Sequence, residues 1–294
     1  MGQFRELLGK KLTVSVELNP PKGTNLEKLY AQAEAVSGQV DAFDFTDSHL
    51  AKMALSPIVA AYLVKQRFGI DVIFNLTCRD RNVIALQSEL LGAAALGLEN
   101  VLVLSGDLPQ VGDHPRAKPV YDLDSLGLIG LIRQLNNGFD LAGNPLNGAP
   151  SFFVGVATNP GGDIRAEVKK LRDRVEAGAD FAITQAVYDP RVFCQFYEEV
   201  KELKVPLIVG VIPLKSYTFA CYLQEKVPGI VIPERSLERM AQAPKGEAKQ
   251  VGLIIIFEVL EEVLPYASGV HIMPIGDQES LRAILQWLTA RMKG

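Results

Sequence analysis

Two kinds of segment alternate along the chain. Short apolar runs rich in β-branched residues recur at residues 12–18, 42–46, 71–77, 100–106, 151–158, 180–185, 205–212 and 268–275. Near-continuous hydrophobicity of this kind is typical of parallel strands that are covered on both faces. The pattern therefore predicts eight parallel strands.

The segments between these runs have a helical period. Over residues 26–36 the apolar side chains fall on one face, and Thr24 with Glu27 has the spacing of a capping box. Further helices are predicted over 163–178, 190–203 and 251–264.

Strands that alternate with helices eight times close most simply into a (β/α)8 TIM barrel. An open, doubly wound sheet is the alternative, and it would carry a G-x-G-x-x-G turn after its first strand. Here that turn is ELNPPKG. The sequence therefore favours the α/β barrel.

The whole chain, residues 1–294, is expected to form a single barrel domain. Two loops exceed the usual length, namely residues 108–150, which are rich in glycine, proline and asparagine around one short helix, and residues 227–250. Loops this long in a compact domain are usually functional, as lids or as walls of a cofactor site.

Composition excludes several classes of protein. The chain has 30 Lys and Arg against 34 Asp and Glu, a net charge of −4, which argues against a nucleic-acid binder. The sequence has neither an apolar window long enough for a membrane span nor a secretory signal, so a cytoplasmic protein is expected. Its three cysteines and three histidines are scattered, which supports neither a disulfide framework nor a zinc cluster.

In a barrel the active site lies at the carboxyl ends of the strands. The polar residues expected there include no histidine and no metal-ligand cluster, and they are Glu17, Thr46, Asp47, Asn75, Thr77, Asp107, Thr158, Asn159, Gln185, Lys215 and Tyr217.

Glu17 is the main candidate for acid chemistry. It follows Thr13 and Ser15 at a period of two, so all three lie on one face of the first strand. On an exposed edge strand that face would meet solvent. In a closed barrel it faces the interior, where desolvation raises the pKa of a carboxyl group and suits it to act as a general acid.

Three other strand-end residues each allow two interpretations. Asp107 either bonds turn amides or provides a fixed negative charge that stabilises a cationic intermediate. The amide of Gln185 either contacts the edge of a heterocycle or makes a structural hydrogen bond. Tyr217 is either a stacking platform or part of the packing of the helix that follows it.

The segment Asn159–Asp163 leads into a helix and contains two glycines. Its amides either hold a phosphate or form a plain turn. In that helix Glu167, Lys170 and Arg174 share a face, which is either solvated or grips a diphosphate.

Seven motifs in order identify a resemblance: VELNPP, LTCRD, LSGDLP, the Asn-Pro turn at 159–160, AGADFAITQ, GVIP and VIPERSLERM. With these motifs the chain resembles the methylenetetrahydrofolate reductase family, flavoprotein (β/α)8 barrels of one-carbon metabolism. The similarity covers roughly residues 12–275.

The resemblance implies a ping-pong reaction in which a reduced flavin, FAD or FMN, passes a hydride to 5,10-methylenetetrahydrofolate and gives 5-methyltetrahydrofolate. It implies that Glu17 protonates the folate bridge nitrogen and that Asp107 steadies the resulting cation, with Gln185 and Tyr217 at the substrate. The positions that the resemblance places around the flavin and its phosphates are Thr46, Asn75, Ser105, Gly106, Asp107, Tyr121, Asp122, Thr158, Glu167, Lys170 and Arg174.

The chain departs from the family pattern in places. Ser105 stands where the family has an arginine, Asn75 where bacterial members usually have a histidine, and the last strand ends in His271-Ile-Met-Pro. These features are similar to the divergent reductases of acetogenic bacteria, which work with a partner subunit. The electron donor is therefore either NAD(P)H or a partner subunit, and the chain is expected to form a homo-oligomer or a complex with an accessory subunit.

Two other functions are open. An aldolase or phosphate-binding lyase on the same fold would need a Schiff-base lysine or a late glycine-rich loop, and Lys215 is the only lysine among the strand-end residues. A non-catalytic folate-binding subunit of a methyl-transfer complex would bind a partner without hydride transfer.

Overall fold

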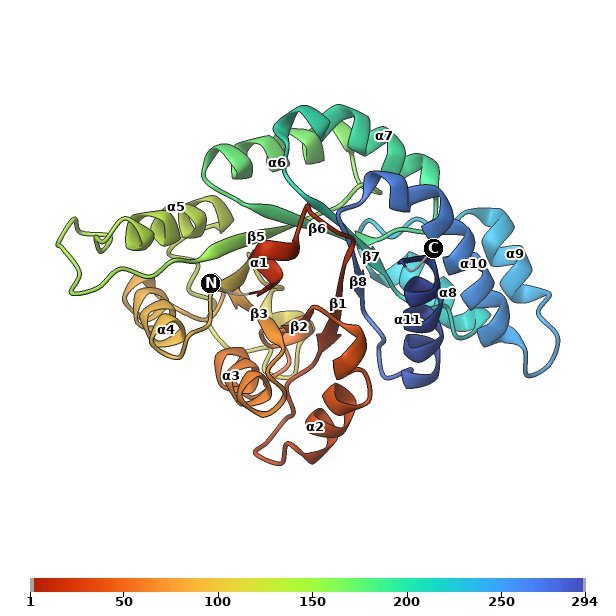
Figure 1. Cartoon of the computed structure of the whole chain (residues 1–294), viewed down its shortest axis with the longest axis horizontal. Coiled ribbons are helices and arrows are strands. Elements are labelled where there is room, and N and C mark those ends of the chain that lie inside the picture. Colours follow the sequence, from red (N-terminus) through yellow and green to blue (C-terminus); the bar gives the residue numbers. More distant parts are fainter. Residues whose placement is uncertain (1–2, 293–294) are drawn as a thin grey trace. The chain divides into compact units, whose positions relative to one another are not determined.

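The structure is a computed structural model that describes residues 3–292, and the strands in this range form a closed parallel barrel in chain order (Figure 1). The strands are β1 Thr13–Leu18, β2 Ala42–Phe45, β3 Asp71–Thr77, β4 Asn100–Leu104, β5 Phe153–Thr158, β6 Phe181–Ala186, β7 Leu207–Val211 and β8 Gly269–Ile272. Each strand lies within its predicted run or one residue beyond it. The predicted TIM barrel is confirmed, and the open sheet is wrong.

Helices follow the strands and also occupy both long loops. The α-helices are α1 Gln3–Leu7, α2 Glu27–Glu34, α3 Pro57–Phe68, α4 Val83–Ala95, α5 Ser125–Asn136, α6 Ile164–Glu176, α7 Pro190–Val200, α8 Tyr217–Lys226, α9 Glu234–Ala241, α10 Ala248–Val263 and α11 Gln278–Met292. The short 3-10 helices are η1 Ser37–Gln39, η2 His49–Ala51, η3 Pro109–Val111, η4 Lys201–Leu203 and η5 Leu264–Tyr266. No helix within residues 3–292 combines the length and hydrophobicity that a membrane span requires.

The predicted capping box at the start of α2 is wrong. The helix begins at Glu27, and no side chain caps it by a hydrogen bond. Instead the side-chain oxygen of Asn25 accepts from the backbone N–H of Glu27 at 2.9 Å. Asn25 is closer to the first turn than Thr24, and an asparagine that bonds two residues ahead forms a tight local turn.

The chain divides into two compact units. The first unit comprises the residues through Leu7, Glu17–Ala157 and Asp173–Phe181, and the second comprises Leu8–Val16, Thr158–Arg172 and Ala182 onward. The single-domain organisation therefore stays a prediction.

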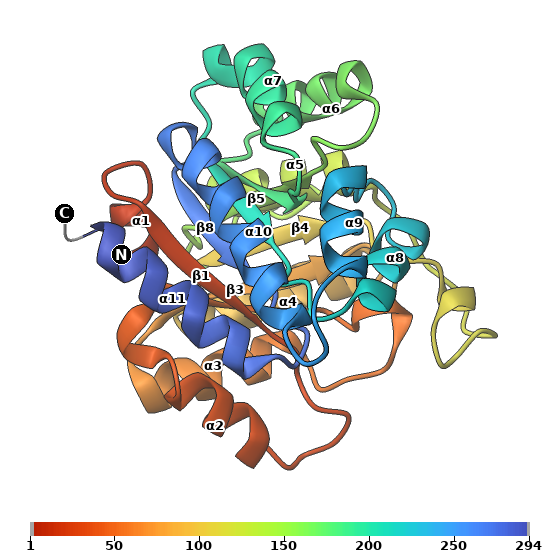
Figure 2. The ribbon, with the colours of Figure 1, turned by 90° about the vertical axis from the view of Figure 1, so that its right-hand side faces the viewer.

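In the first unit, β2, β3 and β4 pair in parallel, with Ala42 opposite Asp71 and Ile73 opposite Asn100. Helix α3 packs on β2 and β3 (Figure 1). In the second unit, β7 and the first part of β1 both pair with β8. There α10 contacts α7, α9 and α11, and α9 also contacts α8 (Figure 2).

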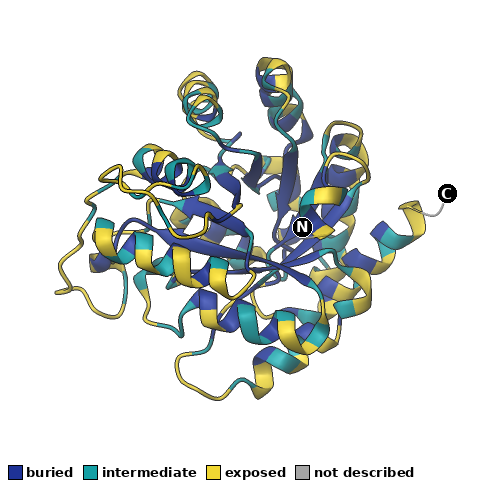
Figure 3. Ribbon diagram, turned by 60° about the vertical axis from the view of Figure 1, so that its left-hand side comes forward, coloured by how far each residue is buried: buried dark blue, intermediate teal, exposed yellow. Residues whose placement is uncertain are grey.

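Burial follows the expected layering, because the strands are buried and the helices expose one face (Figure 3). Every residue of β2 and β3 is buried, and most of them are large and apolar, such as Phe43, Phe45 and Phe74. Asp44 and Asn75 are buried on the same two strands. Burial of polar groups costs free energy, so these two side chains mark a place where a requirement other than packing acts.

Candidate functional site

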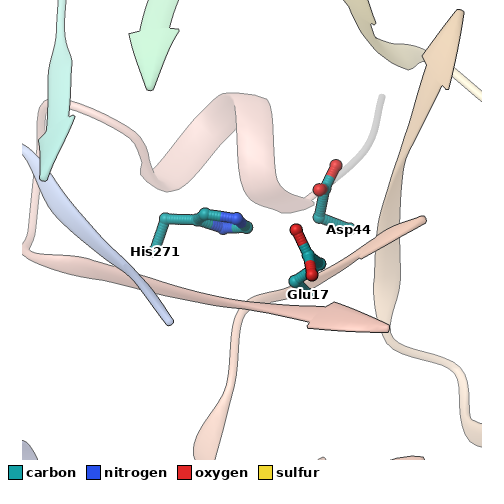
Figure 4. Close-up of side chains that lie close together, drawn as sticks. All are labelled: Glu17, Asp44 and His271. Atoms are coloured by element: carbon teal, nitrogen blue, oxygen red, sulfur yellow. The ribbon is translucent and has the colours of Figure 1, made fainter. Parts of the chain in front are cut away.

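Two carboxyl groups meet at the ends of β1 and β2. Glu17 is half-buried, and Asp44 is 1% exposed. Their oxygen atoms lie within 4.8 Å of one another, and Figure 4 shows the two side chains next to each other. Both residues belong to the first unit. This pair, which we call the acid pair, is the centre of the candidate site.

The pKa values of both members of the acid pair are raised. Burial raises the pKa of Glu17, while the positive charge of His49 and a hydrogen bond with Asn19 lower it. The pKa of Asp44 lies well above its ordinary value because of burial first and the negative charge of Glu17 second, with a hydrogen bond from Asn75 opposing them. The expectation that burial raises the pKa of Glu17 is confirmed. Its role as a general acid stays a prediction.

A hydrogen-bonded chain fixes the donor that faces Glu17. The hydroxyl of Thr46 donates to the side-chain oxygen of Asn19 at 2.9 Å. The NH2 group of Asn19 is therefore turned toward Glu17, and it donates to Oε1 at 3.3 Å. Such a donor stabilises the carboxylate once Glu17 has released a proton. Two prolines follow Asn19 and hold the chain extended as it leaves the strand.

Two buried polar atoms fit a heterocyclic cofactor. Within residues 3–292, Asn75 Oδ1 in the first unit and Thr158 Oγ1 in the second have no hydrogen-bond partner. A buried polar atom left in this way costs about 1–3 kcal/mol. A flavin ring offers both an N–H donor and carbonyl acceptors, so the chemistry of each residue, taken by itself, fits such a ring. Both residues were among the positions predicted to line the flavin, and their chemistry fits it.

The turn after β4 is pressed against β3. Gly106 has φ +87°, and a Cβ atom there would lie 3.0 Å from the Cβ atoms of both Arg79 and Thr77. The hydroxyl of Tyr121 donates to the carbonyl of Gly106 at 3.0 Å. The geometry therefore requires glycine at this position, with Ser105 exposed beside it.

Asp107 offers an exposed carboxylate at this turn. Within the described residues its carboxylate accepts no hydrogen bond from the protein, and only its backbone carbonyl accepts one, from Arg79 at 3.3 Å. The turn-amide interpretation is therefore wrong. Burial raises the pKa of Tyr121, Arg79 lowers it, and the charge of Asp107 raises it again, so the carboxylate acts on this loop as a negative charge.

An arginine does occupy this region, although Ser105 replaces the one that the family pattern has. The side chain of Arg79 is 3% exposed and binds Asp80 through Nε at 2.8 Å and Nη2 at 2.6 Å. Arg79 lies in the motif LTCRD just after β3, and this position at a strand end could have identified it from the sequence.

Two more of the predicted cofactor positions make structural contacts. Asp122 is exposed and accepts from the backbone N–H of Val83 at the start of α4, at 3.2 Å. Arg174 donates to the carbonyl of Ala157 at 2.5 Å and to the hydroxyl of Ser125 at 3.4 Å. Because Arg174 binds other parts of the first unit, the interpretation as part of a purely solvated face is wrong for it.

In the second unit, Gln185 and Tyr217 lie at the end of β6 and the start of α8. The side-chain oxygen of Gln185 accepts from the N–H of Ala186 at 2.9 Å, where the pairing with β7 shifts register. Tyr217 is 45% exposed, so the interpretation as core packing is wrong. A hydrogen bond with Cys221 raises the pKa of Tyr217.

The turn before α6 is a plain turn. Asn159 binds both glycine amides, Gly161 N–H through its side-chain oxygen at 3.2 Å and Gly162 N–H through its carbonyl at 3.1 Å. The amides are occupied, so the phosphate interpretation is wrong for them. Glu167, whose side chain is 13% exposed, binds Lys170 Nζ at 2.7 Å and accepts from the Asn159 N–H at 3.2 Å.

Sequence reasoning missed Asp44, His49 and His271. Asp44 interrupts the apolar run AFDFT, and that interruption was its signal. His49 follows β2 on the short helix η2, and its charge lowers the pKa of Glu17, so the expectation of a site without histidine is wrong. In the second unit His271, also labelled in Figure 4, is buried on β8 with Nδ1 2.9 Å from Ser15 Oγ, and burial lowers its pKa to about 4.

Comparison with known proteins identifies one family. The family model described as methylenetetrahydrofolate reductase matches residues 3–289. Methylenetetrahydrofolate reductase 2 of Schizosaccharomyces pombe is 26% identical over 308 residues, which cover 95% of this chain and 46% of that protein. The 5,10-methylenetetrahydrofolate reductase of Pectobacterium carotovorum is 23% identical, and the match covers 76% of this chain and 72% of the relative. The chain spans about half the length of the eukaryotic relatives that it matches.

Solved structures support the fold. A protein from Clostridium thermocellum, described as uncharacterized and as binding two copies of 5-methyl-5,6,7,8-tetrahydrofolic acid, has a TM-score of 0.66 at 17% identity and covers 96% of this chain. The match covers 95% of that chain. An EDTA monooxygenase from Chelativorans has a TM-score of 0.60 at 12% identity, over 96% of this chain and 94% of its own.

Proposed function

Because the chain belongs to the methylenetetrahydrofolate reductase family, we propose that it reduces 5,10-methylenetetrahydrofolate to 5-methyltetrahydrofolate. The observation that carries this proposal is the acid pair, in which the pKa of a carboxyl group near the end of β1 is raised by burial. The names of the relatives and the methyltetrahydrofolate bound by the Clostridium protein support the same substrate class.

Glu17 provides the proton of the reaction. Its carboxylic acid donates to the bridge nitrogen of the folate, the carbon–nitrogen bond of the five-membered ring breaks, and an iminium cation forms. The carboxylate that remains accepts the hydrogen bond of Asn19, which Thr46 holds in the required orientation. A general acid suits this step when its pKa lies near the working pH, and burial moves Glu17 in that direction.

A flavin bound at the strand ends would supply the hydride that reduces the cation. The residues of this chain that would hold it include Asn75 and Thr158, whose buried polar atoms have no partner within the described residues. We assign the other cofactor contacts to Thr46, Ser105, Gly106, Asp107, Tyr121, Asp122, Glu167, Lys170 and Arg174. FAD is the proposed form of the flavin, and FMN is the alternative.

Asp107 acts through its negative charge and does not transfer a proton. Its exposed carboxylate has no hydrogen-bond donor within residues 3–292, so its negative charge is not offset by such a bond. We propose that this carboxylate stabilises the iminium cation, because a fixed negative charge lowers the energy of the positive charge that develops as the cation forms. Gln185 and Tyr217 are assigned to folate contact.

The proposal extends to the electron donor and to assembly. NAD(P)H or a partner subunit would supply electrons to the flavin, and the working form would be a homo-oligomer or a complex in the cytoplasm. A non-catalytic folate-binding role is the competing function, since the Clostridium neighbour is described only by what it binds.

The test starts from the purified full chain mixed with FAD or FMN. We expect a tightly bound yellow flavin that NADH, NADPH or a reduced viologen dye bleaches under anaerobic conditions. Adding methylenetetrahydrofolate should restore the colour and release methyltetrahydrofolate, which mass spectrometry detects. Failure to bind either flavin while still binding methyltetrahydrofolate would establish the non-catalytic role instead.

A further inference from the structure

We propose that Asp44 is a positioning residue for the proton of this reaction: with Glu17 it forms one acid pair that holds at least one proton through neutral pH. The inference rests on the proposed function for the step it serves, but the coupling between the two carboxyl groups is a property of this chain alone.

The geometry puts the two groups within reach of each other's charge. Their oxygens lie within 4.8 Å, and the side chains come from the adjacent ends of β1 and β2 (Figure 4). Asp44 is 1% exposed, so little water screens the interaction. Two carboxylates that share a poorly solvated site do not both ionise readily, and the pKa of one of them is strongly raised.

Two nearby arginines are engaged by other carboxylates. Asp47 engages Arg81 in an ion pair at 2.7 Å, and Asp80 engages Arg79 at 2.6 Å. The charge of His49 lowers the pKa of Glu17, and hydrogen bonds with the neutral amides of Asn19 and Asn75 lower the pKa values of Glu17 and Asp44 respectively. His271, the titratable group of β8, is uncharged above a pH of about 4.

At neutral pH, burial of the acid pair opposes folding. Desolvation is the largest influence on both carboxyl groups, and each is held in a state that costs free energy at neutral pH. Carboxyl groups whose pKa is raised in this way cluster at functional sites. The benefit here is retention of the proton to be transferred: the negative charge of one carboxylate holds the proton on its neighbour until Glu17 delivers it to the substrate nitrogen.

Carbon-13 NMR of the side-chain carboxyl groups tests the pair directly in the full chain without flavin or folate. Spectra of Glu17→Gln and Asp44→Asn assign the two signals. In the Asp44→Asn variant Glu17 titrates alone. In the unsubstituted chain the last proton of the pair should leave at a pH at least about one unit higher than that, which corresponds to a tenfold difference in proton affinity. Because coupling is reciprocal, Glu17→Gln should lower the titration of Asp44 by the same amount.

Asp41→Asn is the matched control, since it removes a carboxyl group beside the opposite end of the same strand. It should leave both titrations in place. If Asp44→Asn does not fold, Asp44→Ser replaces it. Glu17 titrating at the same pH with and without the Asp44 carboxyl group would overturn the proposal.

A kinetic readout separates this inference from the proposed function. In single-turnover oxidation of the reduced holoprotein by methylenetetrahydrofolate, Asp44→Asn should move the alkaline limb of the pH profile to lower pH by about one unit. An unmoved limb contradicts the role of Asp44. If the two titrations are coupled but Glu17→Gln still reduces folate at the full rate, the coupling between Asp44 and Glu17 stands and the proposed role of Glu17 as the general acid is wrong.

Discussion

Two buried groups of carboxylates lie at neighbouring strand ends, and they are built in opposite ways. Asp47, directly after β2, accepts from Thr77 N–H and Oγ1 at 2.9 Å each and from Arg81 at 2.7 and 3.2 Å. Glu17 accepts one long hydrogen bond, from Asn19 at 3.3 Å. Its neighbour Asp44 is another carboxyl group, so the two groups repel each other when both are ionised. All three are carboxyl groups near strand ends, and their partners differ: Asp47 anchors β2 to β3, whereas the pKa values of the acid pair are raised.

Removing the anchor should have the largest effect on stability. Asp47→Ala leaves Arg81 largely buried without its partner, and a buried ion pair broken in this way costs about 3–5 kcal/mol. Urea denaturation measures the loss. Glu198→Gln, which removes a surface pair with Lys201, is the control and should change little. An equal loss in both variants would show that Asp47 is no anchor.

The buried side chain of His271 extends the comparison to a group that is positively charged when it is protonated. Burial lowers the pKa of His271 to about 4, so the unfolded chain binds the proton more tightly than the folded chain between a pH of about 6.5 and 4. Stability should therefore fall as the pH falls through that window, by about 3 kcal/mol in all at 1.36 kcal/mol for each unit. The variant His271→Asn should flatten this slope, as followed by thermal unfolding at several pH values.

The acid pair should show the reverse dependence. The folded pKa of Asp44 lies above its unfolded value, so its contribution is complete at low pH and is lost as the pH rises through the folded value. Asp44→Asn should therefore unfold at a higher urea concentration than the unsubstituted chain at pH 8, and the gain should shrink at pH 4. Each unit of raised pKa corresponds to about 1.4 kcal/mol. A gain that is independent of pH would mean that packing, not proton binding, explains it.

The smallest effect is expected at the orienting hydroxyl. Thr46→Val removes the bond to Asn19 and should cost about 1 kcal/mol. Released from Thr46, the Asn19 amide can rotate its oxygen toward Glu17, so folate reduction should slow several-fold in single-turnover kinetics. Thr46→Ser retains the hydroxyl and should retain the rate. Equal rates in the two variants would contradict the orienting role.

The fold was predictable because strand burial leaves a strong signal. Runs such as DVIFNLT are apolar on both faces, and their boundaries match β3 residue for residue. The one clear local error, the capping box, arose where Asn25 competes with Thr24 for the same turn. Such competition between adjacent polar residues depends on backbone geometry that spacing alone does not give.

The site was predictable only in part. Glu17 was found because it continues the period-two polar face of Thr13 and Ser15, whereas Asp44, which also lies one residue before the end of its strand, stands alone between two phenylalanines. The partners of Asp47 come from β3 and the loop after it, at least 30 residues away, so nothing in the local sequence distinguishes a fully hydrogen-bonded carboxylate from one whose pKa is raised. That distinction needs tertiary structure.

The central claim is that Glu17 supplies the proton for folate reduction, and one stopped-flow comparison tests it most directly. Protein with reduced flavin, unsubstituted or Glu17→Gln, is mixed with methylenetetrahydrofolate, and reappearance of the oxidised flavin is timed. The account predicts a loss of about 10²–10⁴-fold in this step, with reduction of the flavin by its donor nearly unchanged. Equal losses in both half-reactions, or none in either, would contradict it.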